Sequence, residues 1–338
     1  MRYKNVYIEA LGYVLPELEV RTSEIEAQVA PLYRRMGIKP GWLQAVTGIR
    51  ARRFWPRTLQ PSDVATRAAK EALKSTSIRP EQINTIVSTS VCKDYIEPSV
   101  AALVHGKLGL SSQCTNFDVG NACLGFLTGM MAVADQIELG RIEAALVVAG
   151  ESSRLPTEAT IERLQHPDAG MREFRDNLAT LTLGSAGVAM LLCNEKLASS
   201  RHRFTGGVTQ AATEWSHLCV GTPTKMTTDP TKLLSEGVAL AKRTWIEAND
   251  KLGLSASNVA EFALHQVGRA NHDAVIQALN IKPTKALRLY IDNGNVGACG
   301  VPLTLAKLVE QGRIKNGQRA ALMGIGSGLN VMMMGVEW

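Results

Sequence analysis

The chain has 338 residues, of which 45% are hydrophobic and 20% charged. This composition is typical of a globular protein of about two domains and excludes disordered, collagen-like and small disulfide-rich chains. The formal net charge is +6, but the basic residues are scattered and the densest cluster is the short run Arg50–Arg53. Because only 5% of the residues are aromatic, a base-stacking surface is not indicated and we expect no nucleic-acid partner.

No apolar run approaches the roughly 20 residues that cross a bilayer, and the N-terminal segment lacks a signal-peptide pattern. We therefore expect no membrane span and a cytoplasmic location. The six cysteines have no metal-binding spacing, so we expect free thiols and no metal site. Five of them are interpreted as small buried apolar residues: Cys92, Cys114, Cys193, Cys219 and Cys299.

Helical and strand-like segments alternate along the first half of the chain. The pattern predicts a helix over Asp63–Leu73 with Ser62 as its N-cap, a strand over Asn84–Ser90, and a buried strand over Ala144–Gly150. This alternation favours an α/β fold with sheets covered on both faces. The segment Arg154–Asp176 has helical spacing and mixed charge, without a functional assignment.

Two segments, Phe117–Gly150 and Tyr290–Gly326, share one order of elements. Each predicts a short strand, a turn rich in Gly and Asn, a helix, a Gly-Arg-Ile turn and a buried strand. Two generic βα units alike by chance are the alternative, but the matched order favours an internal duplication. We expect two similar halves, 1–195 and 196–338.

The offset between the two Gly-Arg-Ile turns also relates the candidate functional residues. They begin at Gly140 and Gly312, which are 172 positions apart, and the same offset relates Cys123 to Asn295. Ligands of open α/β sheets bind beyond the carboxyl ends of strands. His265 follows the strand-like run Glu261–Leu264, so we expect these polar groups to meet in one pocket.

Cys123 stands where a helix is expected to begin, and the partial positive charge there predicts a lowered thiol pKa and a nucleophilic thiolate. His265 is the natural base or hydrogen-bond partner, although a lone histidine is more often a buried core residue. Asn295 is suited to donate to a developing oxyanion, although Asn in Gly-rich turns is usually there for its left-handed conformation.

The segment Gly324–Asn330 is not a dinucleotide-binding loop, because a strand and not a helix is expected after it. Its exposed backbone N–H groups suit a thioester oxyanion, and the backbone amides of Cys123 and Ser327 are the expected donor pair. Glu97 precedes a proline, which predicts an extended or turn conformation. From spacing alone, Glu97 and Asp94 are both solvated surface carboxylates.

Taken together, DVGNACLGF, LHQV, GNVGACGVP and GIGSG resemble the ketoacyl synthase III branch of the thiolase superfamily. The resemblance implies a five-layer αβαβα fold of two similar halves, working as a homodimer. It also implies that Cys123 is the acylated nucleophile and that His265 and Asn295 form one oxyanion hole.

Within this branch, SVCKDYIEPS and GGVTQAATEW are most similar to the OleA family, which condenses two fatty acyl-CoA molecules head to head in bacterial olefin biosynthesis. The resemblance implies that Glu97 of the partner subunit removes the α-proton of the second acyl chain. It further implies coenzyme A thioesters as substrates, no permanently bound cofactor, a 2-alkyl-3-oxoalkanoate product and downstream olefin-biosynthesis enzymes as partners.

Departures from the fatty-acid-initiating synthases of the same branch point the same way. Those enzymes have an aromatic residue where Glu97 stands, HQAN in place of His265–Gly268, and an arginine in place of Val46, whereas Trp42 is kept as a candidate contact for the adenine of coenzyme A. The alternatives are a decarboxylating 3-oxoacyl-carrier-protein synthase III that uses malonyl groups, an acyl-CoA thioesterase, and a non-catalytic scaffold. Condensation of two unactivated thioesters requires a base that removes an α-proton. Condensation with a malonyl group does not, because loss of CO2 generates the carbanion.

Overall fold

The strands of the protein form one mixed nine-stranded sheet that consists of two halves joined by a narrow contact. The computed structural model describes residues 1–338, and the strand order is β11-β12-β13-β8-β1-β7-β6-β4-β5. The first half contains β1 (Tyr7–Val14), β4 (Thr85–Ser88), β5 (Thr115–Asp118), β6 (Ala144–Glu151) and β7 (Ala186–Cys193). The second contains β8 (Arg203–Ala211), β11 (Val259–Leu264), β12 (Arg319–Gly326) and β13 (Asn330–Glu337). The halves meet where Tyr7 of β1 pairs with Arg203 of β8.

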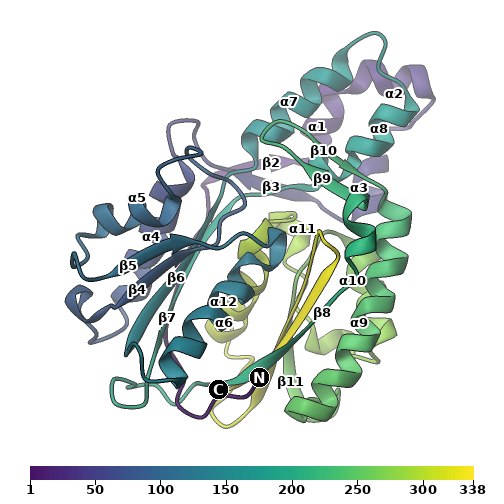
Figure 1. Ribbon diagram of the computed structural model, residues 1–338. Helices are drawn as coiled ribbons and strands as arrows, with labels where there is room; N and C mark the ends of the chain where they lie inside the picture. The colour runs from purple at the N-terminus through teal and green to yellow at the C-terminus, as the bar shows by residue number, and fades with distance from the viewer.

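Helices cover both outer faces and fill the space between the two halves (Figure 1). The outer face of the first half carries α4 (Pro61–Leu73) and α5 (Val100–Leu108), and that of the second half carries α9 (Pro230–Leu252) and α10 (Arg269–Ala278). Between the halves lie α6 (Gly125–Glu138) and α12 (Gly300–Glu310). The expected five-layer αβαβα arrangement is therefore confirmed.

The central strands are buried on both faces, which explains their uninterrupted apolar sequences. All eight residues of β6 and all eight of β7 are buried. The largest apolar cluster, of 34 buried residues, includes inward-facing side chains of α6 and α12. The predicted strands over Ala144–Gly150 and Asn84–Ser90 are confirmed as β6 and β4, and the strand before His265 as β11.

A smaller helical unit with its own apolar cluster stands at one end of the sheet (Figure 1). It is built from α1 (Thr22–Gln28), α2 (Ala30–Met36), α3 (Trp42–Thr47), α7 (Arg154–Gln165) and α8 (Met171–Asn177). Beside it lie two small antiparallel sheets, β2 with β3 (Leu18–Arg21, Ala51–Phe54) and β9 with β10 (Cys219–Gly221, Met226–Thr228). The helical spacing of the 154–176 segment is thereby confirmed. No helix combines the length and apolar character that crossing a bilayer requires.

Two local predictions were wrong. The N-cap of α4 is Gln60, not Ser62, because Gln60 and Asp63 form a capping box and the Ser62 N–H and hydroxyl donate to Asp94. The strand expected at the start of Tyr290–Gly326 is a helical turn, α11 (Tyr290–Asn293), in which the Gly294 N–H donates to the Tyr290 carbonyl at 3.0 Å. The helices and final strands of the two repeats do match. The first repeat has α6 followed by β6, and the second has α12 followed by β12.

Candidate active site

Cys123 lies in a short 3-10 turn, η2 (Ala122–Leu124), between β5 and α6. Ala122 has a left-handed φ of 45°, which turns the chain sharply before the helix. A Cβ at Gly125 would lie 2.5 Å from the carbonyl oxygen of Thr89, so only glycine lets this turn approach the end of β4. Cys123, a half-buried residue, is therefore held beyond a strand end and before a helix, as predicted.

The prediction of a lowered pKa at Cys123 was wrong. Burial raises the pKa of this thiol to about 12, and the carboxylate of Glu151 and the thiol of Cys219 act in the same direction. Desolvation of the thiolate thus outweighs the partial charge of the helix N-terminus. Near neutral pH the free nucleophile is a thiol.

The hairpin turn that carries Ser327 packs against the Cys123 turn. A Cβ at Gly326 would lie 3.3 Å from the carbonyl oxygen of Asn121, and the Asn330 Nδ2 donates to Asn121 Oδ1 at 3.2 Å. Backbone amides of the two turns are therefore neighbours, which is the arrangement that the predicted oxyanion pair requires.

His265 directly follows β11, and its backbone N–H donates to Met323 of β12 at 2.8 Å. Its ring is buried, its Nδ1 has no hydrogen-bond partner, and a Cβ at Gly300 would lie 3.2 Å from that atom. Burial lowers the pKa of His265 to about 4. The imidazole is therefore neutral near neutral pH.

Asn295 is buried, and its main chain is held on both sides. Its N–H donates to Thr182 at 2.8 Å, and its carbonyl accepts from Gly184 at 2.8 Å. Its side-chain Oδ1 accepts from the Gly297 N–H at 3.0 Å. Because the amide oxygen is occupied, the Nδ2 group is left to donate to a substrate oxygen, as expected for an oxyanion-hole residue.

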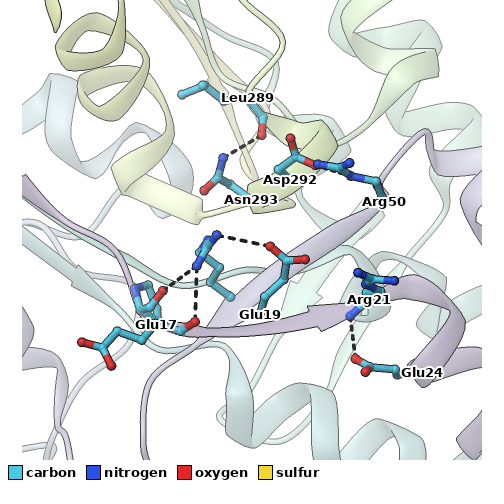
Figure 2. A network of polar contacts seen from close by, with 10 residues as sticks. Glu17, Glu19, Arg21, Glu24, Arg50, Leu289, Asp292 and Asn293 are labelled. Carbon is cyan, nitrogen blue, oxygen red and sulfur yellow. Dashed lines mark hydrogen bonds and ion pairs between the residues drawn. The ribbon is translucent and has the colours of Figure 1, made fainter.

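The segment that precedes Asn295 is fastened to the loop before β3. Figure 2 shows the Arg50 guanidinium beside Asp292, with 2.6 Å between Arg50 Nη2 and Asp292 Oδ1, and the Asn293 Nδ2 donating to Leu289. The Arg50 backbone N–H also donates to Ile291 at 2.7 Å. The exposed ion pair contributes little stability, so the backbone bond is the firmer attachment.

Three of the predicted polar side chains and the Ser327 turn therefore lie on adjoining segments. The Cys123 turn contacts a second 3-10 turn, η6 (Gly297–Cys299), that follows Asn295, and η6 leads into Gly300 beside His265. A small cavity of about 30 Å³, lined by eight hydrophobic residues, adjoins His265. The cavity includes neither Cys123 nor Asn295, but His265 and Asn295 are themselves buried, and burial strengthens hydrogen bonds to developing charge.

Glu97 is placed differently. It is exposed on the loop between β4 and α5, and it lies without a hydrogen bond to the Cys123 turn or to any other part of its own chain. The same loop exposes two large apolar side chains, Tyr95 at 58% and Ile96 at 99%. Asp94, expected to be a solvated carboxylate, instead accepts a 2.9 Å bond from the Ser62 N–H, which fixes the loop to α4.

Trp42 is half-buried in α3, and its ring centroid lies 5.7 Å from that of Phe174 in α8. One side of the indole therefore packs inside the small helical unit. Val46, on the same helix, is exposed. A stacking contact of Trp42 with adenine remains a proposal.

Sequence reasoning missed one buried carboxylate, Glu151. It is the last residue of β6 and is buried. Its Oε1 accepts from the Val91 N–H at 2.8 Å and its Oε2 from the Cys92 N–H at 3.2 Å. Burial raises its pKa. The available signal was a carboxylate at the end of an otherwise apolar strand.

The remaining titratable groups do not form a metal site. No group of three or more His, Cys, Asp or Glu side chains is arranged to hold a metal ion. All six cysteines are free thiols, as expected, and Cys114, Cys193 and Cys299 are buried whereas Cys92 and Cys219 are half-buried.

Comparison with known proteins adds family-level information. Residues 47–204 match the family described as thiolase, N-terminal domain, and residues 250–338 match 3-oxoacyl-[acyl-carrier-protein] synthase III C terminal. The chain is 44% identical to an acyl-CoA:acyl-CoA alkyltransferase of Xanthomonas campestris, with all of both chains covered. It is 39% identical to the enzyme of the same name from Shewanella oneidensis, again over the full length of both.

The fold agrees with solved structures of the Xanthomonas campestris OleA enzyme. The form bound to cerulenin has a TM-score of 0.98 and 43% identity, covering 100% of this chain and 98% of that one. A cysteine variant with bound lauric acid and lauroyl-CoA has a TM-score of 0.97, covering 99% and 100%. Other solved forms replace one glutamate and one histidine, and these two positions and the cysteine have the same spacings along that chain as Glu97, His265 and Cys123 here.

Proposed function

The chain belongs to the acyl-CoA:acyl-CoA alkyltransferases of the thiolase superfamily, and we propose that Cys123, His265, Asn295, Ser327 and the partner subunit's Glu97 carry the reaction. That reaction is head-to-head Claisen condensation of two fatty acyl-CoA molecules. The observation that supports the assignment most is the contact of the Cys123 turn with both the Ser327 turn and the η6 turn after Asn295. The division into halves 1–195 and 196–338 is part of the same proposal.

The first half-reaction transfers one acyl group to Cys123. The sulfur attacks the thioester carbonyl while neutral His265 accepts the thiol proton, and the backbone amides of Cys123 and Ser327 hold the oxyanion. The carbon–sulfur bond to coenzyme A breaks, and the departing thiolate takes the proton from His265. The products are an acyl-cysteine and free coenzyme A.

The second half-reaction forms the carbon–carbon bond. Glu97 of the partner subunit removes an α-proton from the second acyl-CoA, and Asn295 Nδ2 and His265 hold the enolate oxygen. The enolate carbon attacks the acyl-cysteine carbonyl, the bond to Cys123 breaks, and the released thiolate takes up one proton to balance the one that Glu97 removed and releases to solvent. Hydrolysis of the resulting 2-alkyl-3-oxoacyl-CoA gives the 2-alkyl-3-oxoalkanoate.

The supply of Glu97 by a second copy of the chain is supported by the loop that carries it. The base of this loop is anchored by Asp94 on Ser62 and by Lys93, whose Nζ lies 3.3 Å from Asp118. Its tip exposes Ile96 and Tyr95, which is unfavourable in water but suited to insertion at an interface. Burial against a partner also desolvates Glu97, which makes the carboxylate a stronger base.

Substrate and location follow from the same family. We propose fatty acyl-CoA as both donor and acceptor, with Trp42 beside the adenine, and enzymes of olefin biosynthesis as consumers of the product. The proposed steps use only the chain's own groups and the two thioesters. Six free thiols fit a reducing compartment such as the cytoplasm.

The experiment that tests this function incubates the purified protein with myristoyl-CoA alone and identifies the products by mass spectrometry. We expect the condensed β-keto acid, or the ketone formed from it, together with free coenzyme A. Release of myristate only would identify a thioesterase. Turnover that depends on malonyl-carrier protein would identify a decarboxylating synthase, and either result would contradict the proposal.

Two variants separate the half-reactions. Cys123→Ala removes the nucleophile and is expected to abolish the acyl-enzyme, measured as the mass increase of the intact protein. Glu97→Ala leaves that mass increase in place and loses the carbon–carbon bond. A Glu97→Ala protein that still condenses myristoyl-CoA at the wild-type rate would show that this carboxylate is not the base.

A further inference from the structure

Glu151 is a buried carboxylate that none of the proposed steps uses. It ends β6, a strand whose other seven residues are uncharged, and it forms no ion pair with any Lys, Arg or His. Burying an unpaired charge is costly. A carboxylate that filled space only would be replaced by an apolar residue with a gain in stability, so its retention calls for another reason.

The contacts of Glu151 lead to two segments of the site. Its Oε1 and Oε2 accept from the backbone N–H groups of Val91 and Cys92, at 2.8 and 3.2 Å, and these residues form the base of the loop that carries Glu97. On its other side is Gly297, where a Cβ would lie 3.3 Å from the carboxyl carbon.

Gly297 connects Glu151 to the oxyanion-hole residue. Its φ of 57° and its lack of a side chain let the carboxylate pack directly against the backbone. The N–H of the same glycine donates to Asn295 Oδ1 at 3.0 Å, the bond that turns the Asn295 Nδ2 toward a substrate. Gly297 therefore links the two side chains, because it packs against the carboxylate of Glu151 and holds the amide of Asn295.

Resting on the proposed function, we infer that Glu151 is a positioning residue whose buried carboxylate holds the base of the Glu97 loop and the Asn295 turn in register beside Cys123. The backbone N–H groups of Val91 and Cys92 donate to the Glu151 carboxylate, and such hydrogen bonds favour the ionised form. The titratable groups that face it are the thiols of Cys92, Cys123 and Cys299.

This arrangement gives Glu151 an effect on Cys123 that a neutral residue of the same shape lacks. The groups that face the Cys123 thiol are Glu151 from β6 and Cys219 from β9. A negative charge beside a thiol opposes thiolate formation. Glu151 therefore adds to burial, the larger cause, in keeping the free nucleophile protonated.

The test compares Glu151→Gln, which keeps the shape and removes the charge, with the unmodified protein. A matched control, Glu162→Gln, removes an equal charge from an exposed position on α7. Iodoacetamide alkylation of Cys123 is followed across pH by peptide mass spectrometry. In parallel, myristoyl-CoA gives the amount of acyl-enzyme and of condensed product.

In Glu151→Gln we expect Cys123 to alkylate at lower pH, by about one unit or about tenfold faster at a fixed pH. We also expect about tenfold less condensed product per acyl-enzyme, because the two backbone N–H groups donate to different carboxylate oxygens and the NH2 group of Gln would replace one of these acceptors. Glu151→Asp, which keeps the charge, is expected to keep the wild-type alkylation profile, and Glu162→Gln to match the wild type in both measurements.

Unchanged alkylation and condensation in Glu151→Gln would overturn the inference. Should that variant not fold, the unmodified protein still tests it, because alkylation of its Cys123 with the pH midpoint of an ordinary exposed thiol would exclude an influence of Glu151. Alkylation does not depend on the substrate. Failure of the wild type to be acylated by myristoyl-CoA would instead refute the proposed function.

Discussion

At the scale of single residues, the site combines a thiol and an imidazole that are both uncharged in the free chain. Burial raises the pKa of Cys123 to about 12 and lowers that of His265 to about 4, so a thiolate–imidazolium pair is not the resting state. The reactive thiolate forms only in the acylation step, when the proton moves to His265 as the oxyanion develops. Neutral His265 then serves as a hydrogen-bond donor to the enolate.

The lowered pKa of His265 predicts how stability depends on pH. Between pH 6.5 and about 4 the unfolded chain binds a proton at this residue that the folded chain does not bind. The free energy of unfolding therefore falls as the pH decreases through this range, with His265 contributing up to about 3 kcal/mol. Chemical denaturation at several pH values is expected to give a shallower pH dependence for His265→Gln, and identical slopes would contradict the burial argument.

At the scale of elements, the proposed chemistry lies on the loops that carry Glu97 and Asn295 and on the turns that carry Cys123 and Ser327. Each of these segments is held by contacts of its backbone or of neighbouring residues. The turn before Asn295 depends on Gly294, whose φ is 65° and where a Cβ would lie 2.5 Å from the carbonyl oxygen of Thr182. That carbonyl accepts the Asn295 N–H. The glycine is thus required both for its backbone conformation and for close approach.

Gly294→Ala is expected to destabilise the protein and to slow condensation, because the new methyl group displaces Asn295, which is proposed to hold the enolate oxygen, from Thr182. Gly253→Ala is the matched control, since Gly253 has a φ of 66° but nothing within 4 Å of a Cβ. The control is expected to lose only the conformational term of about 1 kcal/mol. Thermal unfolding and the yield of condensed product from myristoyl-CoA compare them, and equal losses in both variants would contradict the close-approach argument.

The tip of the Glu97 loop makes a separate prediction about assembly. Ile96→Glu places a charge on a side chain that is 99% exposed, so the protomer is expected to fold and to form the acyl-enzyme. It is expected to lose dimers and condensation, because a charge at a desolvated interface is unfavourable. Ile246→Glu, at a 70% exposed position on α9, is the control.

Sedimentation and product analysis compare these two variants with the wild type. The control is expected to match the wild-type mass and activity. A stable, condensing dimer of Ile96→Glu would show that the loop tip does not enter an interface.

At the scale of the whole molecule, the matched order of elements predicts that Cys123 and Asn295 occupy equivalent positions of two halves, and the turns beside these two residues are in contact. Continuous apolar runs such as β6 also identified buried strands. The rest depends on three-dimensional contacts that the sequence pattern does not contain. The raised pKa of Cys123 and the attachment of Asp94 to Ser62 arise from segments that are distant in sequence.

Glu151 illustrates the limit of pattern reasoning. Its partners Val91 and Gly297 come from opposite halves of the chain, so no local spacing indicates its surroundings. The helical turn α11 was mistaken for a strand for a similar reason. Its internal hydrogen bonds close a turn that an apolar–polar pattern over so few residues does not distinguish from a strand.

The most direct test of the account combines two inactive variants, Cys123→Ala and Glu97→Ala. The variants are co-expressed with different tags, and the dimers that carry both tags are isolated. Neither homodimer contains a complete site. In a mixed dimer, the intact Cys123 of one protomer meets the intact Glu97 of the other, so one of the two sites is whole. We expect condensation of myristoyl-CoA to return to about half of the wild-type level in the isolated mixed dimers, and to about a quarter in an unseparated, randomly paired mixture, whereas no recovery in verified mixed dimers would contradict catalysis across the interface.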